Sequence, residues 1–264
     1  MSAMKEPGVP LAEIAVHLDT VLRTSEIPDY PGALNGVQVE NTDPVHRVAV
    51  AVDASLQTIQ GAIDDGANLL IVHHGLFWAG AQPLRGRIYD RFRRLITNDI
   101  AVYSSHLPLD LHPTLGNNVL LAHALGLDPT EGFARFQSIA VGVMGNADID
   151  TAALVDRAGA IARAEGGTLV TAGVTSGRRT RRWAICSGSG ASSDTLREAA
   201  AAGVDTLIVG EGAHHTGVEG PELGIVVLYA GHYATETFGV RALGKELERR
   251  FDLPWTFVTA PTGL

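Results

Sequence analysis

The sequence is poor in cysteine and has no long hydrophobic run. Its single cysteine, Cys186, cannot form a disulfide within the chain, and the strand-like neighbours 183–185 predict a buried, unreactive thiol. Apolar runs such as residues 69–72 fall far short of the ~20 residues that a membrane span needs. Residues 1–7 lack the basic and apolar segments of an export signal, so we expect a cytoplasmic protein.

Positive charge is also scarce, because 20 Lys and Arg stand against 29 Asp and Glu and give a formal net charge of -9 at pH 7. Nucleic acid rewards a basic surface, so no nucleic acid partner is expected. Residues 178–182 are the exception, with four arginines in five positions, and we interpret them as a solvated turn between strands. The composition, 45% hydrophobic and 19% charged over 264 residues, is typical of a folded α/β protein with one or two domains.

Two common catalytic motifs are missing. The chain has neither the G-x-x-x-x-G-K-[ST] loop that holds nucleotide phosphates nor the G-x-S-x-G turn of serine hydrolases. Gly188-Ser189-Gly190 follows an expected strand but lacks the third glycine of a dinucleotide-binding turn, so we interpret it as an ordinary turn. Histidine is abundant instead, with ten residues, of which seven lie in three short segments. This distribution points to metal chemistry.

Alternating apolar and amphipathic stretches predict a βαβ pattern in the first half of the chain. Residues 48–52 predict a buried strand, Ser55 is expected to cap a helix over 56–65, and Gly66 is expected to end that helix. The elements expected next are a strand over 68–72, a helix near 89–98 and a strand over 100–103. Both of these later strands are followed closely by histidines.

The chain contains an internal repeat. Residues 66–75 align without gaps with residues 203–212, so that His73-His74 matches Gly210-Glu211. Two shorter matches keep the same order, namely residues 53–55 with 190–192 and residues 100–106 with 226–232. The last pair each end in a histidine that a carboxylate follows four residues later. Three ordered matches at expected strand ends favour two related α/β units that arose from an internal duplication.

The remaining elements suggest how the chain divides. A turn-forming segment lies at residues 128–132. After it we expect a strand over 138–144, a helix over 151–164 and a strand over 168–172. A last helix over 235–249 and a last strand over 255–258 are expected to return to the first unit. We therefore expect a first α/β unit of residues 1–128 with 233–264, which carries most metal ligands, and a second α/β unit of residues 129–232.

Imidazole and carboxylate side chains follow several of the expected strands. They are His73 and His74, His106 with Asp110, and His232 with Glu236. Ligands collect beyond the carboxyl ends of strands in α/β sheets, and several elements are needed to surround an ion. Adjacent strand residues project to opposite sides, so His73 and His74 are expected to serve two divalent ions ~3.5–4 Å apart.

Glu236 is the best candidate to bridge two ions, because its two oxygens can each bind one. His232 and Glu236 are four residues apart at the start of a helix and therefore face the same way. His106, and Glu211 through its place in the repeat, are candidate catalytic residues. His112, in the loop beside Asp110, is equally well interpreted as a ligand or as an ordinary loop histidine. His214 and His215 are expected to line the cleft without being primary ligands.

Several segments carry a resemblance to a known family. They are residues 34–39, 70–78, 105–110, 116–118, 210–211, 214–215 and 231–236. The double histidine and the final G-H-x-x-T-E are the most specific of them. With these segments the chain resembles the Nif-three-like dinuclear metal proteins, a family also described as type-2 GTP cyclohydrolase I homologues.

The resemblance implies a Nif-three-like fold and a site with two metal ions. It implies His74 and Asp110 on one ion, His73 and His232 on the other, and Glu236 between them. His106 then lies near the site without being a primary ligand. The resemblance also implies a homohexameric ring. Zinc is the default metal, and iron or manganese would suit the same ligands.

The activity implied by the resemblance is hydrolytic. Water activated by metal would attack C8 of GTP and release formate on the way to dihydroneopterin triphosphate. Two alternatives stay open: a dinuclear phosphoesterase acting on nucleotides, and a metal-binding or interaction protein without catalysis. A small nucleotide substrate and other copies of the chain are the expected partners, and no membrane partner is expected.

Overall fold

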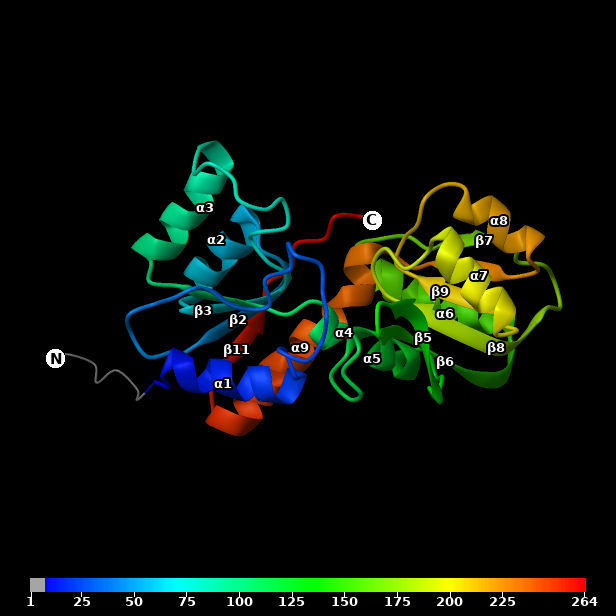
Figure 1. The fold of residues 1–264 in the computed structure, drawn as a ribbon, viewed down its shortest axis with the longest axis horizontal. Coiled ribbons are helices and arrows are strands. Elements are labelled where there is room, and N and C mark those ends of the chain that lie inside the picture. The colour runs from blue at the N-terminus through cyan, green and yellow to red at the C-terminus, as the bar shows by residue number, and fades with distance from the viewer. Residues whose placement is uncertain (1–7) are drawn as a thin grey trace. The chain divides into compact units, whose positions relative to one another are not determined.

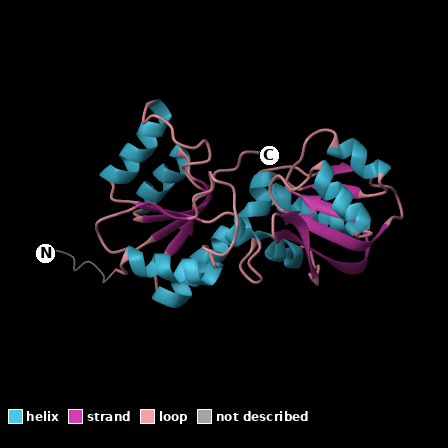
Figure 2. Ribbon diagram, viewed as in Figure 1, coloured by secondary structure: helices cyan, strands magenta, loops and turns pink. Residues whose placement is uncertain are grey.

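The computed structural model describes residues 8–264, which form two compact units. Unit 1 takes the described chain up to Leu109 together with Gly239–Ala260, and unit 2 takes Asp110–Phe238 together with Pro261–Leu264. Each unit is a sheet covered by helices (Figure 2). The chain thus passes from unit 1 into unit 2, returns to unit 1 at Gly239, and has its last four residues in unit 2.

Unit 1 contains a five-stranded sheet in the order β1-β4-β3-β2-β11. Its elements in chain order are α1 (Leu11–Leu22), β1 (Gly36–Val39), β2 (Val48–Asp53), α2 (Leu56–Asp65), β3 (Leu69–His74), α3 (Gly86–Thr97), β4 (Ala101–Ser104), α4 (Leu107–Asp110, whose last residue belongs to unit 2), most of α9 (His232–Phe251) and β11 (Trp255–Phe257). Strands β11, β2, β3 and β4 are parallel, and β1 is antiparallel to β4. The predicted return of the last strand to the first unit is confirmed, since β11 pairs with β2.

The central strands of unit 1 are apolar because both faces of the sheet are covered. Helices α2 and α3 lie on one face, and α1 and α9 lie on the other (Figure 1). The α2–α3 face buries alternate residues of the strands, among them Ala49, Ala51, Leu70, Val72 and Val102. A side chain at Gly244 of α9 would collide with the Trp255 ring, so glycine allows the close packing of this helix on β11.

Helix α2 forms as the sequence predicts. The Ser55 side chain accepts a hydrogen bond from the Thr58 backbone N–H, and the Thr58 hydroxyl accepts one from the Ser55 N–H. This reciprocal capping box satisfies two donors at the helix start. Gly66 ends the helix in the left-handed conformation with φ +74°, which glycine adopts at little cost.

Unit 2 contains a six-stranded sheet in the order β5-β6-β8-β9-β10-β7. Its elements are α5 (Asn117–Ala124), β5 (Glu131–Phe136), β6 (Ile139–Asp150), α6 (Thr151–Ala164), β7 (Val170–Ala172), β8 (Arg179–Cys186), α7 (Ser193–Ala201), β9 (Thr206–Val209), α8 (Thr216–Glu222), β10 (Val226–Tyr229) and the first part of α9. Strands β8, β9 and β10 are parallel, while β5, β6 and β7 each run antiparallel to a neighbour.

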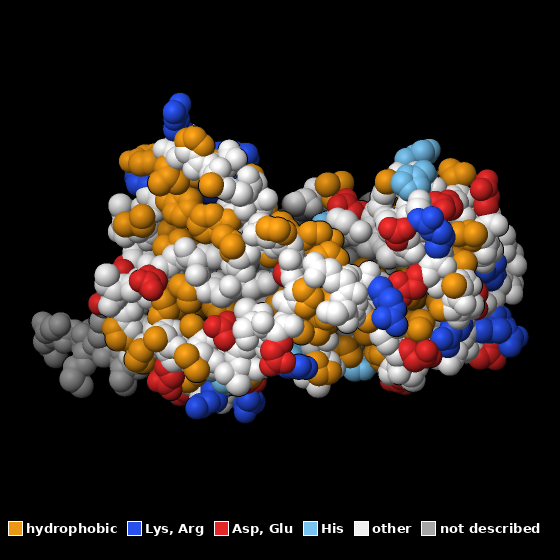
Figure 3. All heavy atoms as spheres, viewed as in Figure 1, with side chains coloured by type: hydrophobic (Ala, Val, Ile, Leu, Met, Phe, Trp, Pro, Cys, Tyr) orange, Lys and Arg blue, Asp and Glu red, His pale blue; other side chains and the backbone are white. Residues whose placement is uncertain are grey.

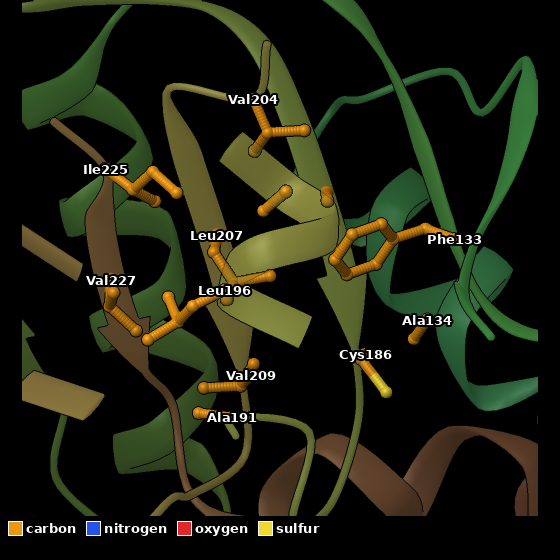
Figure 4. Close-up of a cluster of buried hydrophobic side chains, with 12 residues drawn as sticks. Phe133, Ala134, Cys186, Ala191, Leu196, Val204, Leu207, Val209, Ile225 and Val227 are labelled. Atoms are coloured by element: carbon orange, nitrogen blue, oxygen red, sulfur yellow. The ribbon is translucent and has the colours of Figure 1, made fainter. Parts of the chain in front are cut away.

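The sheet of unit 2 has a separate core on each face. Leu196 of α7 packs with Phe133, Leu207 and Val227 on one face, where these side chains point toward one another (Figure 4). The other face buries Trp183, Ile185, Ile208 and Leu228 against α5 and α6. Neighbouring residues of a strand alternate between the two cores, as the period of two in a β-strand requires.

The two units share one topology. The series β1-β2-α2-β3-α3-β4 of unit 1 corresponds to β7-β8-α7-β9-α8-β10 of unit 2, with the same strand directions. Even the capping box is repeated, because Ser192 and Thr195 exchange the hydrogen bonds that Ser55 and Thr58 exchange. The predicted fold, two related α/β units, is confirmed.

Some elements differ from the predicted ones. Strand β5 lies over residues where the sequence suggested a domain boundary, and β6 extends well past the expected strand 138–144. The compact units change over at residues 109/110 and 238/239, whereas the sequence suggested 128/129 and 232/233. Unit 2 begins earlier than predicted because Leu121 and Leu125 of the α5 region pack in its core that lies against α5 and α6, and it ends later because Phe238 packs against the same core.

The surface mixes acidic and basic side chains over the face shown in Figure 3. The arginine run 178–182 largely forms the beginning of β8, so its interpretation as a turn is wrong. Arg179 pairs with Asp148, and Arg182 pairs with Glu131. Among residues 8–264, no helix combines the length and the apolar character that crossing a membrane requires.

The repeated capping box gives a first prediction. Ser55→Ala and Ser192→Ala should each lower the free energy of unfolding by about 1 kcal/mol, because each removes the side-chain acceptor at a helix start. Ser176→Ala, in an exposed turn, is the control and should change it little. Urea denaturation followed by circular dichroism measures all three. Equal stability of the wild type and both capping variants would contradict the structural role of the boxes.

Candidate metal centre

Polar side chains gather at the carboxyl edge of the parallel strands in unit 1. Strand β2 ends at Asp53, β3 ends at His73-His74, and Ser105-His106 follows β4 directly. Since β2, β3 and β4 are neighbours and parallel, their ends meet at one edge of the sheet. The repeated βα topology therefore positions these groups together.

The three histidines of this edge form one cluster. Potential ligand atoms of His73, His74 and His106 all lie within 4.8 Å of one another. The ring centroids of His73 and His74 are 4.7 Å apart, and those of His73 and His106 are 4.9 Å apart. The expectation that His73 and His74 project to opposite sides is wrong for their rings. Strand alternation fixes the direction of the Cβ atoms, whereas hydrogen bonds orient the rings.

Each of these rings is held through its Nδ1 atom. The Nδ1 of His73 lies 2.9 Å from the Ser105 carbonyl oxygen, and the Nδ1 of His74 lies 2.9 Å from a carboxylate oxygen of Asp53. The Nδ1 of His106 lies 2.8 Å from a carboxylate oxygen of Asp29. Carbonyl and carboxylate oxygens only accept, so Nδ1 donates in each case. A neutral ring then carries its lone pair on Nε2, which is the arrangement found in histidines that bind metals.

Asp29 is the buried anchor of His106. Its carboxylate also accepts hydrogen bonds from the Asn35 side chain at 2.8 Å and the Leu107 backbone N–H at 2.9 Å. Burial alone would raise the pKa of Asp29, but the hydrogen bonds and the His106 imidazole outweigh it and lower this pKa. The Asn35 carbonyl oxygen in turn accepts from the His106 N–H at 2.7 Å. The position of His106 is therefore fixed from two sides.

Unit 2 gathers polar groups at the equivalent edge of its own sheet. Gly188 follows β8, Glu211 follows β9, and His232 begins α9 shortly after β10. The Nδ1 of His232 lies 2.8 Å from a Glu211 oxygen, and its Nε2 lies 3.1 Å from a Glu236 oxygen. His232 is thus a fourth histidine whose Nδ1 donates to an oxygen.

The two carboxylates concentrate negative charge around His232. Burial acts to lower the pKa of His232, but the hydrogen bonds and charges of Glu236 and Glu211 outweigh it and raise this pKa to about 9. In the protein without metal, the ring is therefore protonated at neutral pH, and its Nε2 forms an ion pair with Glu236. A cation bound by these two side chains would take the place of that proton.

Gly188 leaves the space in which the Glu236 carboxylate lies. A Cβ atom at residue 188 would lie 2.1 Å from Glu236 Oε1 and 3.3 Å from His232 Nε2. Gly188 also has φ +60°, which an L-residue adopts only with strain. Glycine is therefore required at position 188 because the backbone approaches the Glu236 side chain closely.

Asp110 lies at the same edge of unit 2. It is 4% exposed, and one of its oxygens accepts a hydrogen bond from the Asn117 side chain at 2.8 Å. The Ser187 hydroxyl lies 3.4 Å from the same oxygen. Ser187 immediately precedes Gly188, so the end of β8 positions Asp110 on one side and Glu236 on the other.

The donor set fits divalent transition metals. Imidazole nitrogens and carboxylate oxygens are the usual ligands of zinc, iron and manganese. The 3.1 Å between His232 Nε2 and Glu236 Oε2 matches the ~3.0–3.4 Å expected for two ligand atoms that each lie ~2.1 Å from one ion. The structure brings together His73, His74 and His106 within unit 1, and Asp110, Glu211, His232 and Glu236 within unit 2.

Sequence analysis did not find the groups that hold the ligands in place. Asp53 lies in the repeat beside the Ser55 cap, so its position at a strand end was an available signal. Asp29 gave no such signal, because it lies in the loop before β1 and is 77 residues from His106. Asn117 was part of a matching segment, but only the structure shows its hydrogen bond to Asp110.

Other predicted residues have structural roles. Cys186 is buried, and burial together with the charges of Asp110, Glu236 and Glu198 raises the pKa of its thiol to about 12. These surroundings agree with the unreactive thiol that the sequence predicts. His112 accepts hydrogen bonds from its own loop through Nδ1, at 3.0 Å from the Leu115 N–H. The arginine run forms the first part of β8, at the opposite end of that strand from Gly188.

Comparisons with known proteins agree with this fold. The family model described as Duf34/NIF3 (NGG1p interacting factor 3) matches residues 10–262. A protein of Deinococcus radiodurans named GTP cyclohydrolase 1 type 2 homolog is 42% identical over 252 residues, which cover 96% of this chain and 94% of that protein. A protein of the same name from Pyrococcus abyssi is 37% identical, with coverage of 96% and 98%.

The fold is also known from solved structures. The protein TTHA1606 from Thermus thermophilus matches with a TM-score of 0.81 and 35% identity, and the match covers 97% of this chain and 100% of that one. The molecule is therefore an α/β protein of the NIF3 type. The chain belongs to the Duf34/NIF3 family, and the resemblance inferred from its sequence is confirmed.

The space beside Gly188 can be tested with a matched pair of variants. Gly188→Ala and Gly177→Ala both force a residue with positive φ, at a cost of about 1 kcal/mol each, but nothing lies within 4 Å of the added Cβ at 177. Gly188→Ala should therefore be the more destabilising by at least about 1 kcal/mol, because it displaces the Glu236 carboxylate. Thermal unfolding of metal-free protein measures the difference, and equal losses would contradict the close packing.

Proposed function

We propose that this protein is a hydrolase that depends on two divalent metal ions and acts as a type-2 GTP cyclohydrolase I. It would open the imidazole ring of GTP and release formate. The observation that carries the proposal is the shared state of the three proposed histidine ligands, His73, His74 and His232: the Nδ1 of each is held by an oxygen, which leaves Nε2 to face a metal ion. The names of the relatives from Deinococcus radiodurans and Pyrococcus abyssi support the choice of reaction.

The proposed ligand set is the one that the family resemblance implies. His74 and Asp110 would bind one ion, His73 and His232 the other, and Glu236 both. Asp110 and Glu236 are only 4% and 3% exposed. Buried carboxylates need an opposite charge beside them, and two bound cations would supply it. Zinc is the proposed metal, and iron or manganese would suit the same atoms. A homohexamer in the cytoplasm completes the proposal.

The chain's own residues would orient the substrate and move protons. Bound divalent ions would lower the pKa of water and neutralise negative charge that develops on the substrate. A Glu211 oxygen lies 2.8 Å from His232 Nδ1, and the Glu211 side chain is 39% exposed. Glu211 can therefore also accept a proton from a group that is not a metal ligand. His106 has the Asp29 carboxylate behind it, which stabilises the ring when it accepts a proton. We propose these two residues for proton transfer.

The ligand assignment predicts a loss of metal on substitution. Glu236→Ala and His74→Ala should each lower bound metal to less than about half of the wild-type content, because each removes one of the proposed ligands. Elemental analysis of purified protein measures this loss. Glu222→Ala and His123→Ala, at exposed positions, are the matched controls and should keep full metal content. Unchanged metal in Glu236→Ala, with an unchanged circular dichroism spectrum, would overturn the assignment.

The proposed reaction is tested with GTP itself. Metal-loaded protein incubated with GTP should release formate and yield a product with pterin fluorescence, and Glu236→Ala should reduce the rate roughly a hundredfold or more. Formate is measured enzymatically and the product by fluorescence after oxidation. The absence of both signals with zinc, iron and manganese in turn would rule out the cyclohydrolase reaction. Release of inorganic phosphate in the same assay would instead indicate a phosphoesterase.

A further inference from the structure

Unit 1 contains a pocket that none of the assigned roles uses. It has a volume of about 260 Å³ and lies between the ends of β2 and β3, the loop after β3, and α3. His74 and Asp53 line one side of it, so the pocket opens beside the histidine cluster. Pockets for whole drug-sized ligands measure about 300–1,000 Å³, so this one has room for a part of a larger ligand.

Two arginines face this pocket from α3. Arg87 and Arg91 are four residues apart, so they lie on the same face of the helix, and both line the pocket. Across residues 8–264, neither guanidinium takes part in an ion pair or side-chain hydrogen bond, and the Nε of Arg91 is buried without a partner. Two like charges on neighbouring turns repel each other, and an anionic ligand would relieve that repulsion.

The charge of the protein makes this pair unusual. The chain carries a net charge of -9, and carboxylates neutralise the guanidinium groups of Arg47, Arg179 and Arg182. The negative charge of Asp53 acts on Arg91 and favours its charged form. The same carboxylate accepts a hydrogen bond from His74 at 2.9 Å. Burial and the charge of Arg87 both lower the pKa of Arg91. Two guanidinium groups thus share the pocket with one carboxylate, so the pocket keeps a net positive charge.

Aromatic rings form the other walls of the pocket. The rings of Phe77 and Phe92 lie 5.9 Å apart, and Trp78 lies beside them in the loop after β3. The Trp78 ring contacts His106 and His74 edge to face, at centroid distances of 4.7 and 5.7 Å. Apolar walls exclude water and strengthen an ion pair formed inside the pocket. Trp78 thus lines the pocket and contacts the histidine cluster.

We propose that this pocket, the Arg87–Arg91 pocket, binds the phosphate groups of the nucleotide substrate. The inference rests on the proposed function for the identity of the nucleotide, and on the pocket itself for the anion. Guanidinium groups bind phosphate oxygens through paired hydrogen bonds, and two of them suit a polyphosphate chain. A ligand held there would have its phosphates between α3 and the loop, and its remaining part beside Trp78 and His74.

The test uses full-length protein from which metal has been removed, so that no ion contributes to phosphate binding. Inorganic triphosphate, GTP and guanosine are titrated separately, and binding is measured by calorimetry and by the fluorescence of Trp78. Arg87→Gln and Arg91→Gln should each weaken the binding of triphosphate and GTP about tenfold or more. Arg93→Gln, an exposed arginine of the same helix, is the control and should bind as the wild type does. Trp78→Phe should lose the fluorescence change and keep the calorimetric signal.

The outcomes separate this proposal from the proposed function. Wild-type affinity for triphosphate in both Arg87→Gln and Arg91→Gln would overturn the phosphate pocket, as would no binding of triphosphate to the wild type. Binding that depends on the arginines, without formate release by metal-loaded protein, would keep the pocket and reject the cyclohydrolase reaction. Formate release with an unchanged KM for GTP in both variants would keep the cyclohydrolase reaction and reject the phosphate pocket.

Discussion

A neutral imidazole offers a lone pair from one ring nitrogen only, so a histidine can bind metal predictably when its other nitrogen is fixed as a donor. In this protein the fixing groups are one backbone carbonyl and three carboxylates, which belong to Ser105, Asp53, Asp29 and Glu211. Each lies on a strand end or in a loop close to one. The candidate metal centre therefore depends on acceptors that never need to touch a metal ion.

The internal duplication explains how one chain supplies so many of these groups. In both units, three adjacent parallel strands end at one edge, and short loops follow them. The residues at equivalent ends have diverged: β3 ends in His73-His74, whereas Gly210-Glu211 follows β9. One copy thus provides imidazoles where the other provides a carboxylate and a backbone without a side chain. Divergence of a repeat yields complementary donors from a single topology.

Much of the fold could be predicted from the sequence because its signals are local. Ser55 and Gly66 mark the ends of α2, and the VAVAV run of β2 indicates a strand buried on both faces. Other elements carried weaker signals. Strand β5 lies across a segment rich in turn-forming residues, and its pairing with β6 decides its conformation. Helix α5 belongs to unit 2 only because its leucines pack there.

The candidate site was predictable in its residue types and not in its geometry. A carboxylate four residues after His232 shows from the sequence that the two side chains share a helix face. The direction of the His73 and His74 rings depends on Ser105 and Asp53, which tertiary structure brings to them. The support of His106 by Asp29 joins residues far apart in the chain, so no spacing rule could reveal it.

Anomalous X-ray diffraction from crystals of zinc-loaded protein, recorded on both sides of the zinc edge, shows whether these donors bind a pair of metal ions. Two anomalous peaks per chain are expected, ~3.5–4 Å apart, with His73 and His232 on one, His74 and Asp110 on the other, and Glu236 on both. One peak alone, or peaks bound by other residues, would contradict this assignment.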